Sequence, residues 1–230
     1  GDDSSPISIK KGWSGALKIA AVEDAKLIIV TLDMMESQLT YQTANFGAYL
    51  WTPGNHQGWT PATSVKLYSA NKDGKYNGFL NLDGEFKLTS EADWEHTNYG
   101  DGGNGSIDPA GGNLSAEKGF YYMNVDLTAN TYSLTAVNSW GIIGSGVANG
   151  WDSDTYQLTY DAEKNAWCVA DAVINGEIKF RANGGWDINV GGSLNQLSPN
   201  GANINVEEGT YDVELYLINE EESKVVLTKK

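Results

Sequence analysis

A repeat with a period of 92 residues is the feature that most limits what this chain can fold into. Lys87 and Trp94 return as Lys179 and Trp186, each 92 positions later (179 − 87 and 186 − 94). Both lie in related stretches that open with Gly-Glu and place the lysine after an aromatic or aliphatic residue. Scarce residue types that keep one interval over such a distance indicate two copies of a single structural unit.

A second marker of the repeat lies upstream of each copy. Gly-Trp pairs end at Trp59 and Trp151, and their interval is also 92 positions (151 − 59). Each pair follows glycine and turn-forming residues, so we expect both tryptophans to lie in loops at the edge of a strand.

Composition and pattern predict that the repeated unit is built from β-strands. The 230 residues include 27 glycines but 5 prolines, and no long apolar helical pattern is present. Short strand-like runs recur between turns, which is typical of β-sandwich modules. We therefore expect an all-β protein with tandem Ig-like β-sandwich modules at 47–137 and 138–230, preceded by an N-terminal β segment at 1–46 that is a partial or shortened module.

Hairpin patterns support this division of the chain. Residues 25–33 and 38–41 read as two strands around a turn, and similar pairs recur within 119–134 and, more loosely, within 209–227. The N-terminal segment contains Trp13 but no lysine-plus-tryptophan signature, so no binding site is assigned to it.

The charge of the chain limits its partners. A net charge of −15 and a pI near 4.4 argue against nucleic acid, because a phosphate backbone requires basic side chains. An uncharged polysaccharide would meet no such penalty. The acidic surface can equally serve solvation alone.

The repeated residue types suit a neutral, hydroxylated ligand with a flat face. A pyranose ring has an apolar C–H face that an indole can cover, and such an aromatic contact contributes roughly 0.5–1.5 kcal/mol beyond area burial. A lysine donates to hydroxyls, and an asparagine both donates and accepts. Two indoles, one lysine and one asparagine would hold a few sugar units with an affinity of about 10 μM to 1 mM.

Packing is the competing explanation for the tryptophans, because a single tryptophan in a β-domain is more often buried than exposed. Trp51, Trp140 and Trp167 lie close to strand patterns, and we expect them to pack. The repeated pairs lie beside glycines and turns instead, which favours exposure.

These motifs resemble a known family of carbohydrate-binding repeats. Tyr-Leu-Trp-Thr-Pro-Gly-Asn-His-Gln-Gly-Trp59, Gly84-Glu-Phe-Lys-Leu and Trp94-Glu-His-Thr-Asn-Tyr-Gly100 are similar to the repeats of SusE and SusF, the outer-membrane starch-binding lipoproteins of Bacteroidetes. Weaker similarity extends to modules of amylopullulanases, to the starch-binding domain of glucoamylase and to the glycogen-binding domain of AMP-activated kinase. The resemblance covers residues 47–230.

The resemblance implies a set of binding residues and a cellular setting. By position, the carbohydrate-binding residues are Trp59, Lys87, Trp94, Asn98 and Tyr99 in the first module and Trp151, Lys179, Arg181, Trp186 and Asn189 in the second. It also implies a polysaccharide such as starch or another α-glucan as the partner, association with an outer-membrane importer complex, and a location on the extracellular face of the outer membrane. The start of the chain, Gly-Asp-Asp-Ser-Ser-Pro6, is similar to the tract after the lipidated cysteine of such lipoproteins, so the expected contact with the membrane is an N-terminal lipid anchor.

The second module departs from the family pattern. Ile188-Asn-Val-Gly replaces Thr97-Asn-Tyr-Gly, and Asn189 comes one place early. Arg181 and Asn183 could compensate, and the second module could also differ in specificity or lack binding. The first site carries His56 and Gln57 beside Trp59, so its preference could also differ from starch.

Catalysis, a cofactor and a membrane span have little support. The histidines, His56 and His96, lie in predicted loops with no Gly-x-Ser-x-Gly elbow nearby, and Cys168 lies in an apolar strand pattern, so we expect no enzyme activity. The longest apolar run is far too short to cross a bilayer.

A weaker alternative concerns a metal ion. The glycine-rich loop at 100–113 offers oxygen ligands for calcium at Asp101, Asn104 and Asp108, although it lacks the spacing of an EF-hand. The rival to glycan binding as a whole is a structural or adhesive spacer protein made of the same modules.

Overall fold

The computed structural model describes residues 7–8, 27–33, 38–44 and 46–230, with side chains from residue 46 onward. Three N-terminal strands, β1 (Ile7–Ser8), β2 (Leu27–Asp33) and β3 (Gln38–Ala44), form a sheet in the order β1-β3-β2. The predicted hairpin at 25–41 is thereby confirmed. Trp13 lies outside the described residues.

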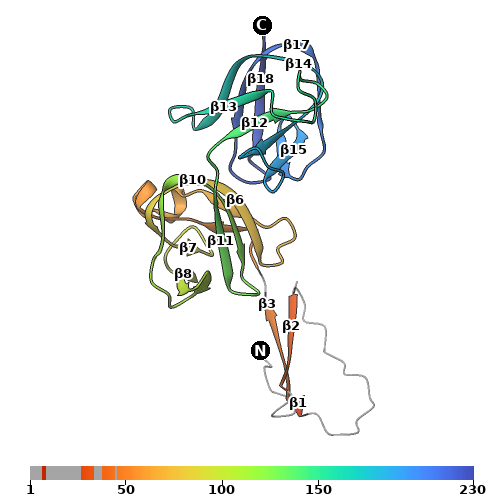
Figure 1. Cartoon of the computed structure of the whole chain (residues 1–230). Helices are drawn as coiled ribbons and strands as arrows, with labels where there is room; N and C mark the ends of the chain where they lie inside the picture. The colour runs from red at the N-terminus through yellow and green to blue at the C-terminus, as the bar shows by residue number, and fades with distance from the viewer. Residues whose placement is uncertain (1–6, 9–26, 34–37, 45) are drawn as a thin grey trace, which may run out of the picture.

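The first module is a closed barrel of antiparallel strands (Figure 1). Its strands are β4 (Tyr49–Trp51), β5 (Lys66–Tyr68), β6 (Lys75–Phe86), β7 (Leu88–Thr89), β8 (Asn98–Gly103), β9 (Ser106–Asp108), β10 (Leu114–Asp126) and β11 (Thr131–Ala136), with short 3-10 turns η1 (Asn55–Gln57) and η2 (Pro61–Thr63). Long strands β6 and β10 pair along most of their length, whereas single residue pairs such as Trp51 with Thr89 and Tyr68 with Asn77 complete the ring.

The second module repeats the same order of elements as a seven-stranded sheet. Its strands are β12 (Trp140–Ile143), β13 (Tyr156–Asp161), β14 (Ala166–Ala182), β15 (Asn189–Ser193), β16 (Gln196–Pro199), β17 (Ile204–Tyr216) and β18 (Lys224–Lys229). β14 corresponds to β6 and β7 joined, and it pairs with both β12 and β17. The all-β expectation is confirmed, and the described residues include no helix long and apolar enough to cross a membrane.

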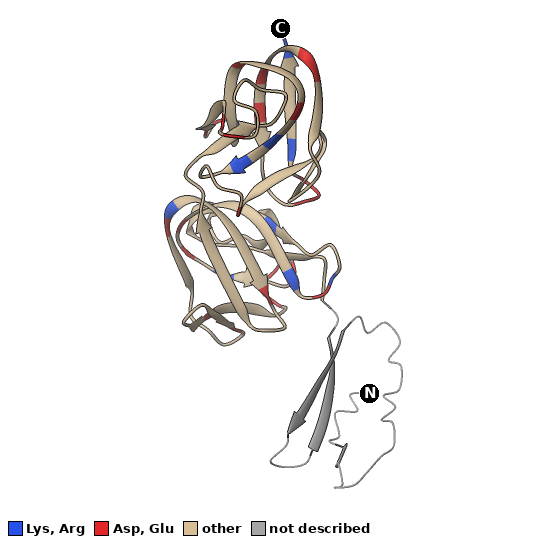
Figure 2. Ribbon diagram, turned by 45° about the vertical axis from the view of Figure 1, so that its right-hand side comes forward, with Lys and Arg blue, Asp and Glu red and all other residues tan. Residues whose placement is uncertain are grey.

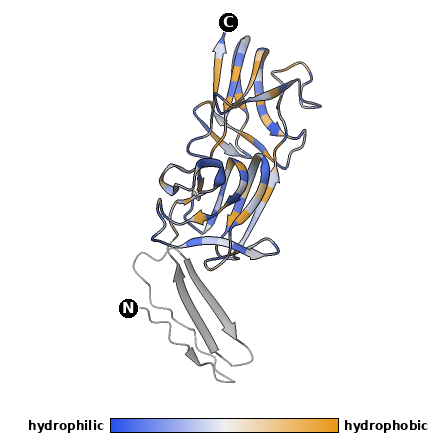
Figure 3. Ribbon diagram, turned by 90° about the vertical axis from the view of Figure 1, so that its left-hand side faces the viewer, coloured by the Kyte–Doolittle hydropathy of each residue, from blue (hydrophilic) through white to orange (hydrophobic). Residues whose placement is uncertain are grey.

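Each module has its own core, formed by alternating apolar residues of the long strands (Figure 3). Trp140 and Trp167 are buried in the second core, as expected from their strand patterns, and Trp51 is half-buried. Charged residues are spread over both modules (Figure 2).

Strands β6 and β10 carry apolar residues on both faces. Successive side chains of a strand point to opposite faces. Leu80 and Met123 therefore face the first core, whereas Phe79 packs in the core of the second module, with its ring centroid 5.6 Å from that of Trp140 and 4.7 Å from that of Tyr122 in its own module. The two modules thus share an aromatic contact.

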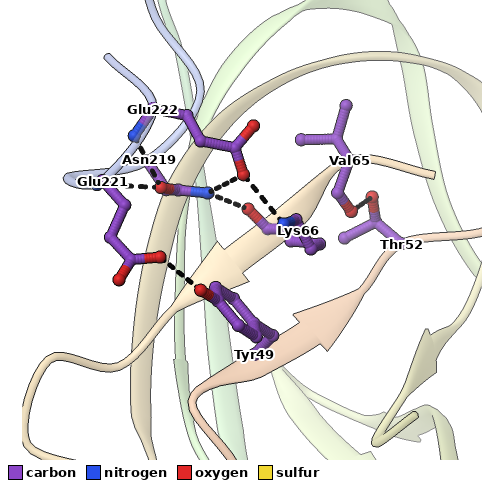
Figure 4. Close-up of polar contacts among 7 residues, drawn as sticks. All are labelled: Tyr49, Thr52, Val65, Lys66, Asn219, Glu221 and Glu222. Atoms are coloured by element: carbon purple, nitrogen blue, oxygen red, sulfur yellow. Dashed lines mark hydrogen bonds and ion pairs between the residues drawn. The ribbon is translucent and has the colours of Figure 1, made fainter. Parts of the chain in front are cut away.

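A polar contact strengthens the same junction (Figure 4). Asn219, which is 2% exposed, donates to the Lys66 carbonyl at 3.0 Å and accepts from the backbone of Glu221 and Glu222. Glu222 pairs with the Lys66 ammonium at 2.9 Å. The Tyr49 hydroxyl donates to Glu221, and this carboxylate raises the pKa of Tyr49 to about 12.

Glycine makes close approach possible at the junction. A Cβ on Gly78 would lie 2.9 Å from the Ile218 carbonyl, which accepts a hydrogen bond from the Phe79 backbone. A side chain at this position would therefore push the second module away from β6.

We predict that Asn219→Ala lowers the free energy of unfolding by about 1–3 kcal/mol, because it removes a buried side chain whose amide bonds the Lys66 carbonyl and whose oxygen accepts from the Glu221 N–H. Urea unfolding followed by fluorescence measures this change. Asn203→Ala is the matched control, since Asn203 is exposed and bonds only Glu177, and we expect it to change stability by less than about 0.5 kcal/mol. Equal effects of the two substitutions would contradict the role of Asn219.

Candidate functional site

Two pairs of tryptophans have the same geometry in the two modules. The ring centroids of Trp59 and Trp94 lie 6.2 Å apart with a tilt of 34°, and those of Trp151 and Trp186 lie 6.2 Å apart with a tilt of 36°. Trp94, Trp151 and Trp186 are 42%, 38% and 45% exposed, and Trp59 is half-buried. Indoles so open to solvent contribute little to a core.

Glycines position the loop that carries the first tryptophan of each pair. A Cβ on Gly54 would lie 2.6 Å from the Glu85 carbonyl, and a Cβ on Gly146 would lie 2.7 Å from the Gly176 backbone. Only glycine permits the loop backbone to lie so close to β6 and β14. The glycines directly before Trp59 and Trp151 have positive φ angles of 81° and 59°, which turn the chain outward.

The two loops hold their indoles differently. The Trp59 Nε1–H donates to Asn55 Oδ1 at 2.7 Å, which fixes the ring against its own turn. Val147 occupies the position equivalent to Asn55 and offers no such acceptor. Asn55 was not among the predicted site residues, and its only signal in the sequence is its place four residues before the tryptophan.

The second tryptophan of each pair lies in a short loop closed by one backbone hydrogen bond. Ser90 donates to Thr97 in the first module and Ala182 donates to Ile188 in the second, each at 2.8 Å. The second loop is one residue shorter. That difference explains why Asn189 comes one place early in the sequence.

Strand pairing shows that Asn98 and Asn189 are equivalent. Asn98 begins β8 and pairs with Thr89, and Asn189 begins β15 and pairs with Arg181. Thr89 and Arg181 are themselves 92 positions apart (181 − 89). The departure of the second module from the family pattern is therefore a loop shortening that preserves the place of the asparagine.

In the second module a network joins the lysine, the asparagine and the tryptophan loop. Lys179 donates to Asn189 Oδ1 at 2.9 Å, and the Asn189 amide donates to the Trp186 carbonyl at 2.9 Å and to Asn200 at 2.8 Å. Burial lowers the pKa of Lys179. Asn189 is 6% exposed and donates both of its amide hydrogens, so the network ties Lys179 to the backbone of the Trp186 loop and leaves the half-buried lysine as its more accessible member.

In the first module the equivalent groups are not joined to one another. Lys87 donates to the Gly111 carbonyl at 2.8 Å, and Asn98 donates to the His96 carbonyl at 3.2 Å. Both side chains are half-buried. A ligand hydroxyl would compete with these backbone bonds.

A buried ion pair lies beside the Trp151–Trp186 pair, which we call the second platform; the Trp59–Trp94 pair is the first platform. Arg181, which is 8% exposed, bonds Asp154 at 2.6 Å, and its guanidinium lies 5.1 Å from the centroid of the Trp186 ring. A cation over an indole face is attracted by the ring electrons. Sequence reasoning identified Arg181 but missed Asp154, because one carboxylate among thirty acidic residues carries no distinguishing signal.

Two further residues named from the sequence serve packing and the junction. Tyr99 is half-buried and packs against the core of the first module, and burial raises the pKa of its hydroxyl. Asn183 donates to Ala136 and accepts from the backbone of Asn138. It therefore holds the connection between the modules, so it is not available to compensate in the second site.

The oxygen groups considered for calcium are engaged in turns. Asp101 accepts from the Gly103 backbone at 2.9 Å, and Asp108 accepts from the Ala110 backbone at 2.7 Å. Asn104 lies between them with a positive φ of 53°. Among the residues that the structure describes, no three His, Cys, Asp or Glu side chains are grouped to hold a metal ion.

The residues considered for catalysis, His56, His96 and Cys168, each lie in a separate environment. Burial lowers the pKa of His56, with partial offset from the Thr52 backbone and Asp83, and neither ring nitrogen has a hydrogen-bond partner among the described residues. His96 is exposed and bonds Asp93 at 2.9 Å. Burial raises the pKa of the Cys168 thiol, which disfavours the reactive thiolate.

Comparison with known proteins gave no match, either to a protein-family model or to a curated protein.

We predict that Asp154→Ala lowers the free energy of unfolding by about 3–5 kcal/mol, because it leaves the buried Arg181 charge without its partner. Guanidinium unfolding of the full chain measures the loss. Asp152→Ala serves as the control, since this exposed carboxylate lies two residues away in the same turn. If both substitutions cost the same, the ion pair does not support the platform.

We also predict a pH dependence that originates at His56. The pKa of His56 is lowered in the native state, so as the pH falls through about 6.5 the unfolded chain binds a proton at this residue while the native chain does not. The stability of the native state therefore falls as the pH falls. His56→Gln should flatten this decline between about pH 7.5 and 5.5 in thermal unfolding.

His96→Gln should have the opposite effect on the pH dependence of stability, because it removes a contribution that is largest at low pH. The Asp93 carboxylate raises the pKa of His96, so its contribution is present below pH 6.5 and is lost as pH rises through the native value. Identical pH profiles for the two variants would show that the environment of His56 is not the cause.

Proposed function

We propose that this protein binds polysaccharide without catalysis, with one tryptophan platform on each module. The observation that carries the proposal is the repeated indole pair, which keeps a 6.2 Å separation and a tilt of 34° or 36° although the surrounding polar groups differ. Exposed aromatic groups whose geometry is preserved while their neighbours change point to a shared ligand.

The chemistry of each platform suits a sugar chain. The indoles cover the apolar C–H faces of pyranose rings, and Lys179 with Asn189 offers donors and an acceptor to the hydroxyls in the second module. Lys87 and Asn98 offer the same groups in the first module once a ligand displaces their backbone partners.

The tilt between the rings favours an α-glucan such as starch. Two indoles whose planes differ by 34–36° cannot both lie flat on one planar, ribbon-like chain. In a helical α-glucan the faces of successive sugar rings turn relative to each other. The ligand class we propose is therefore a curved, neutral glucan.

Two weak sites on one rigid chain would act together. The aromatic and polar junction between the modules fixes the distance between the platforms. Linked sites raise avidity if their spacing fits the polymer, without any new contact.

The finer fold and the setting are part of the same proposal. The shared element order supports two variants of one Ig-like β-sandwich carbohydrate-binding module, similar to those of SusE and SusF. By that resemblance the protein would be an outer-membrane lipoprotein that captures glycan at the cell surface and passes it to an importer complex. A structural or adhesive spacer is the alternative, and it would bind no glycan.

We predict that Trp94→Ala and Trp186→Ala each weaken retention in starch or glycogen gels partly, and that the double substitution abolishes it. Each removal takes an indole face from one platform while the other platform remains, which is expected to weaken that site by up to roughly tenfold. Val226→Ala, on an exposed residue of β18, is the control and should leave retention unchanged.

Affinity electrophoresis with starch, glycogen, xyloglucan and mannan measures the effect and ranks the ligands. A reducing-end assay on the same mixtures tests the absence of catalysis. Full retention of a folded double variant would refute the proposed platforms, and a wild-type chain that no gel retards would favour the spacer.

A further inference from the structure

A cleft between the two modules is separate from both tryptophan platforms. It has a volume of about 710 Å³ and is lined by residues of β6 and β10 in the first module and of β13, β14 and the turn between them in the second. Pockets that hold small molecules commonly measure about 300–1,000 Å³ and occur at domain interfaces. The size and the place of the cleft both fit a binding site.

One wall of the cleft is aromatic. Phe120 comes from the first module, and Tyr160 and Trp167 come from the second. The ring centroids lie 5.8 Å apart for Phe120 and Tyr160, 5.7 Å for Phe120 and Trp167, and 5.3 Å for Tyr160 and Trp167. Trp167 is 6% exposed and packs against the other two rings, so a sugar ring that enters the cleft would meet the half-buried Phe120 and Tyr160, one from each module.

Amide groups lie at the edge of this wall. Asn81 donates to the Tyr160 hydroxyl at 2.6 Å, and that hydroxyl donates to Asn165. Among the described residues, the side-chain oxygen of Asn81 and the side-chain amino group of Asn165 make no hydrogen bond. The oxygen can therefore accept from a ligand hydroxyl, and the amino group can donate to one.

An unsatisfied imidazole lies at the same cleft. His56 lines it from the loop that carries Trp59, and among the described residues neither of its buried ring nitrogens makes a hydrogen bond of ordinary geometry, although the Thr52 backbone lies close enough to raise its pKa. Buried polar atoms without a partner are uncommon in native proteins. A hydroxyl that enters the cleft could supply the missing hydrogen bond after a small shift of the ring.

The charge of the cleft is balanced. Lys118 and Asp83, which also line it, pair with each other at 3.6 Å. A ligand that carries a net charge would gain no uncompensated partner from these two groups. The aromatic wall, the free amide groups and this balance together favour a neutral, hydroxylated ring.

We propose that the cleft between the modules is a third carbohydrate site, which binds the terminal one or two sugar rings of a neutral glycan. A concave site encloses a chain end, whereas an open platform binds the interior of a chain. The sugar class rests on the proposed function, and the cleft itself rests on separate residues. Retention in polymer gels depends on the platforms, because chain ends are rare in a polymer, and short oligosaccharides bind the cleft even without them.

The test uses the full chain with Trp94→Ala and Trp186→Ala, so that both platforms are absent. Maltotriose, with cellotriose and mannotriose for comparison, is titrated to about 10 mM, since a single small site is expected to bind in the millimolar range. The indole N–H signal of Trp167, identified by its loss in Trp167→Phe, is followed by heteronuclear NMR. We expect a saturable shift of this signal with at least one trisaccharide.

Two variants test the location. Ala162→Tyr places a ring in the cleft from an exposed turn and should remove the shift, whereas Ala129→Tyr, on an exposed turn between β10 and β11 that does not line the cleft, should not. Asn81→Ala should weaken binding several-fold, and Asn124→Ala, at an exposed residue of β10 that does not line the cleft, should leave it unchanged.

The outcomes separate the two proposals. If the wild-type chain is retained in starch gels but no trisaccharide shifts the Trp167 signal in the chain without platforms, the cleft proposal is overturned and the platforms stand. A shift that survives both Ala162→Tyr and Asn81→Ala also overturns it. A shift that both variants remove supports the cleft, even where the wild-type chain is not retained in any gel.

Discussion

Much of the arrangement of this molecule follows from the contact between its two modules. Strands β6 and β10 present apolar residues on both faces, so the first module must cover its outer face with the second. Phe79 belongs by sequence to the first module and by packing to the second core. This aromatic contact and the Asn219 hydrogen bonds join the modules and set the spacing of the two platforms. The same junction encloses a cleft between the modules.

Strand β17, the counterpart of β10 in the second module, carries a charged residue where β10 carries an aromatic one. Tyr121 and Tyr211 each bond a backbone carbonyl four residues upstream, which aligns β10 with β17. In that alignment Asp212 takes the place of Tyr122, and it pairs with Lys230 at 3.0 Å. Residues that face the core are therefore similar in the two modules, whereas the outward residues are apolar where they contact protein and charged where they contact water.

The two platforms share the geometry of their indoles and differ in their polar support. Lys179, Asn189 and the Trp186 loop form one connected network, with the Arg181–Asp154 pair beneath it. In the first module Lys87 and Asn98 bond the backbone instead. A preorganised site loses less entropy when a ligand binds, and by this measure the polar groups of the second module are held more firmly than those of the first.

Interval and alternation are local properties of the chain, and they were enough to predict the repeat, the all-β character, the exposure of Trp94, Trp151 and Trp186, and the burial of Trp140 and Trp167. Trp59, which the same pattern predicted to be exposed, is half-buried. The sequence did not reveal Asp154, because the partner of a buried arginine is chosen by the fold and not by spacing. Nor did it give the equivalence of Asn98 and Asn189, which depends on strand pairing across a shortened loop. Nothing in the sequence indicated that the second module would cover the outward side of Phe120 and Tyr122, because this packing depends on contacts between residues far apart in the chain.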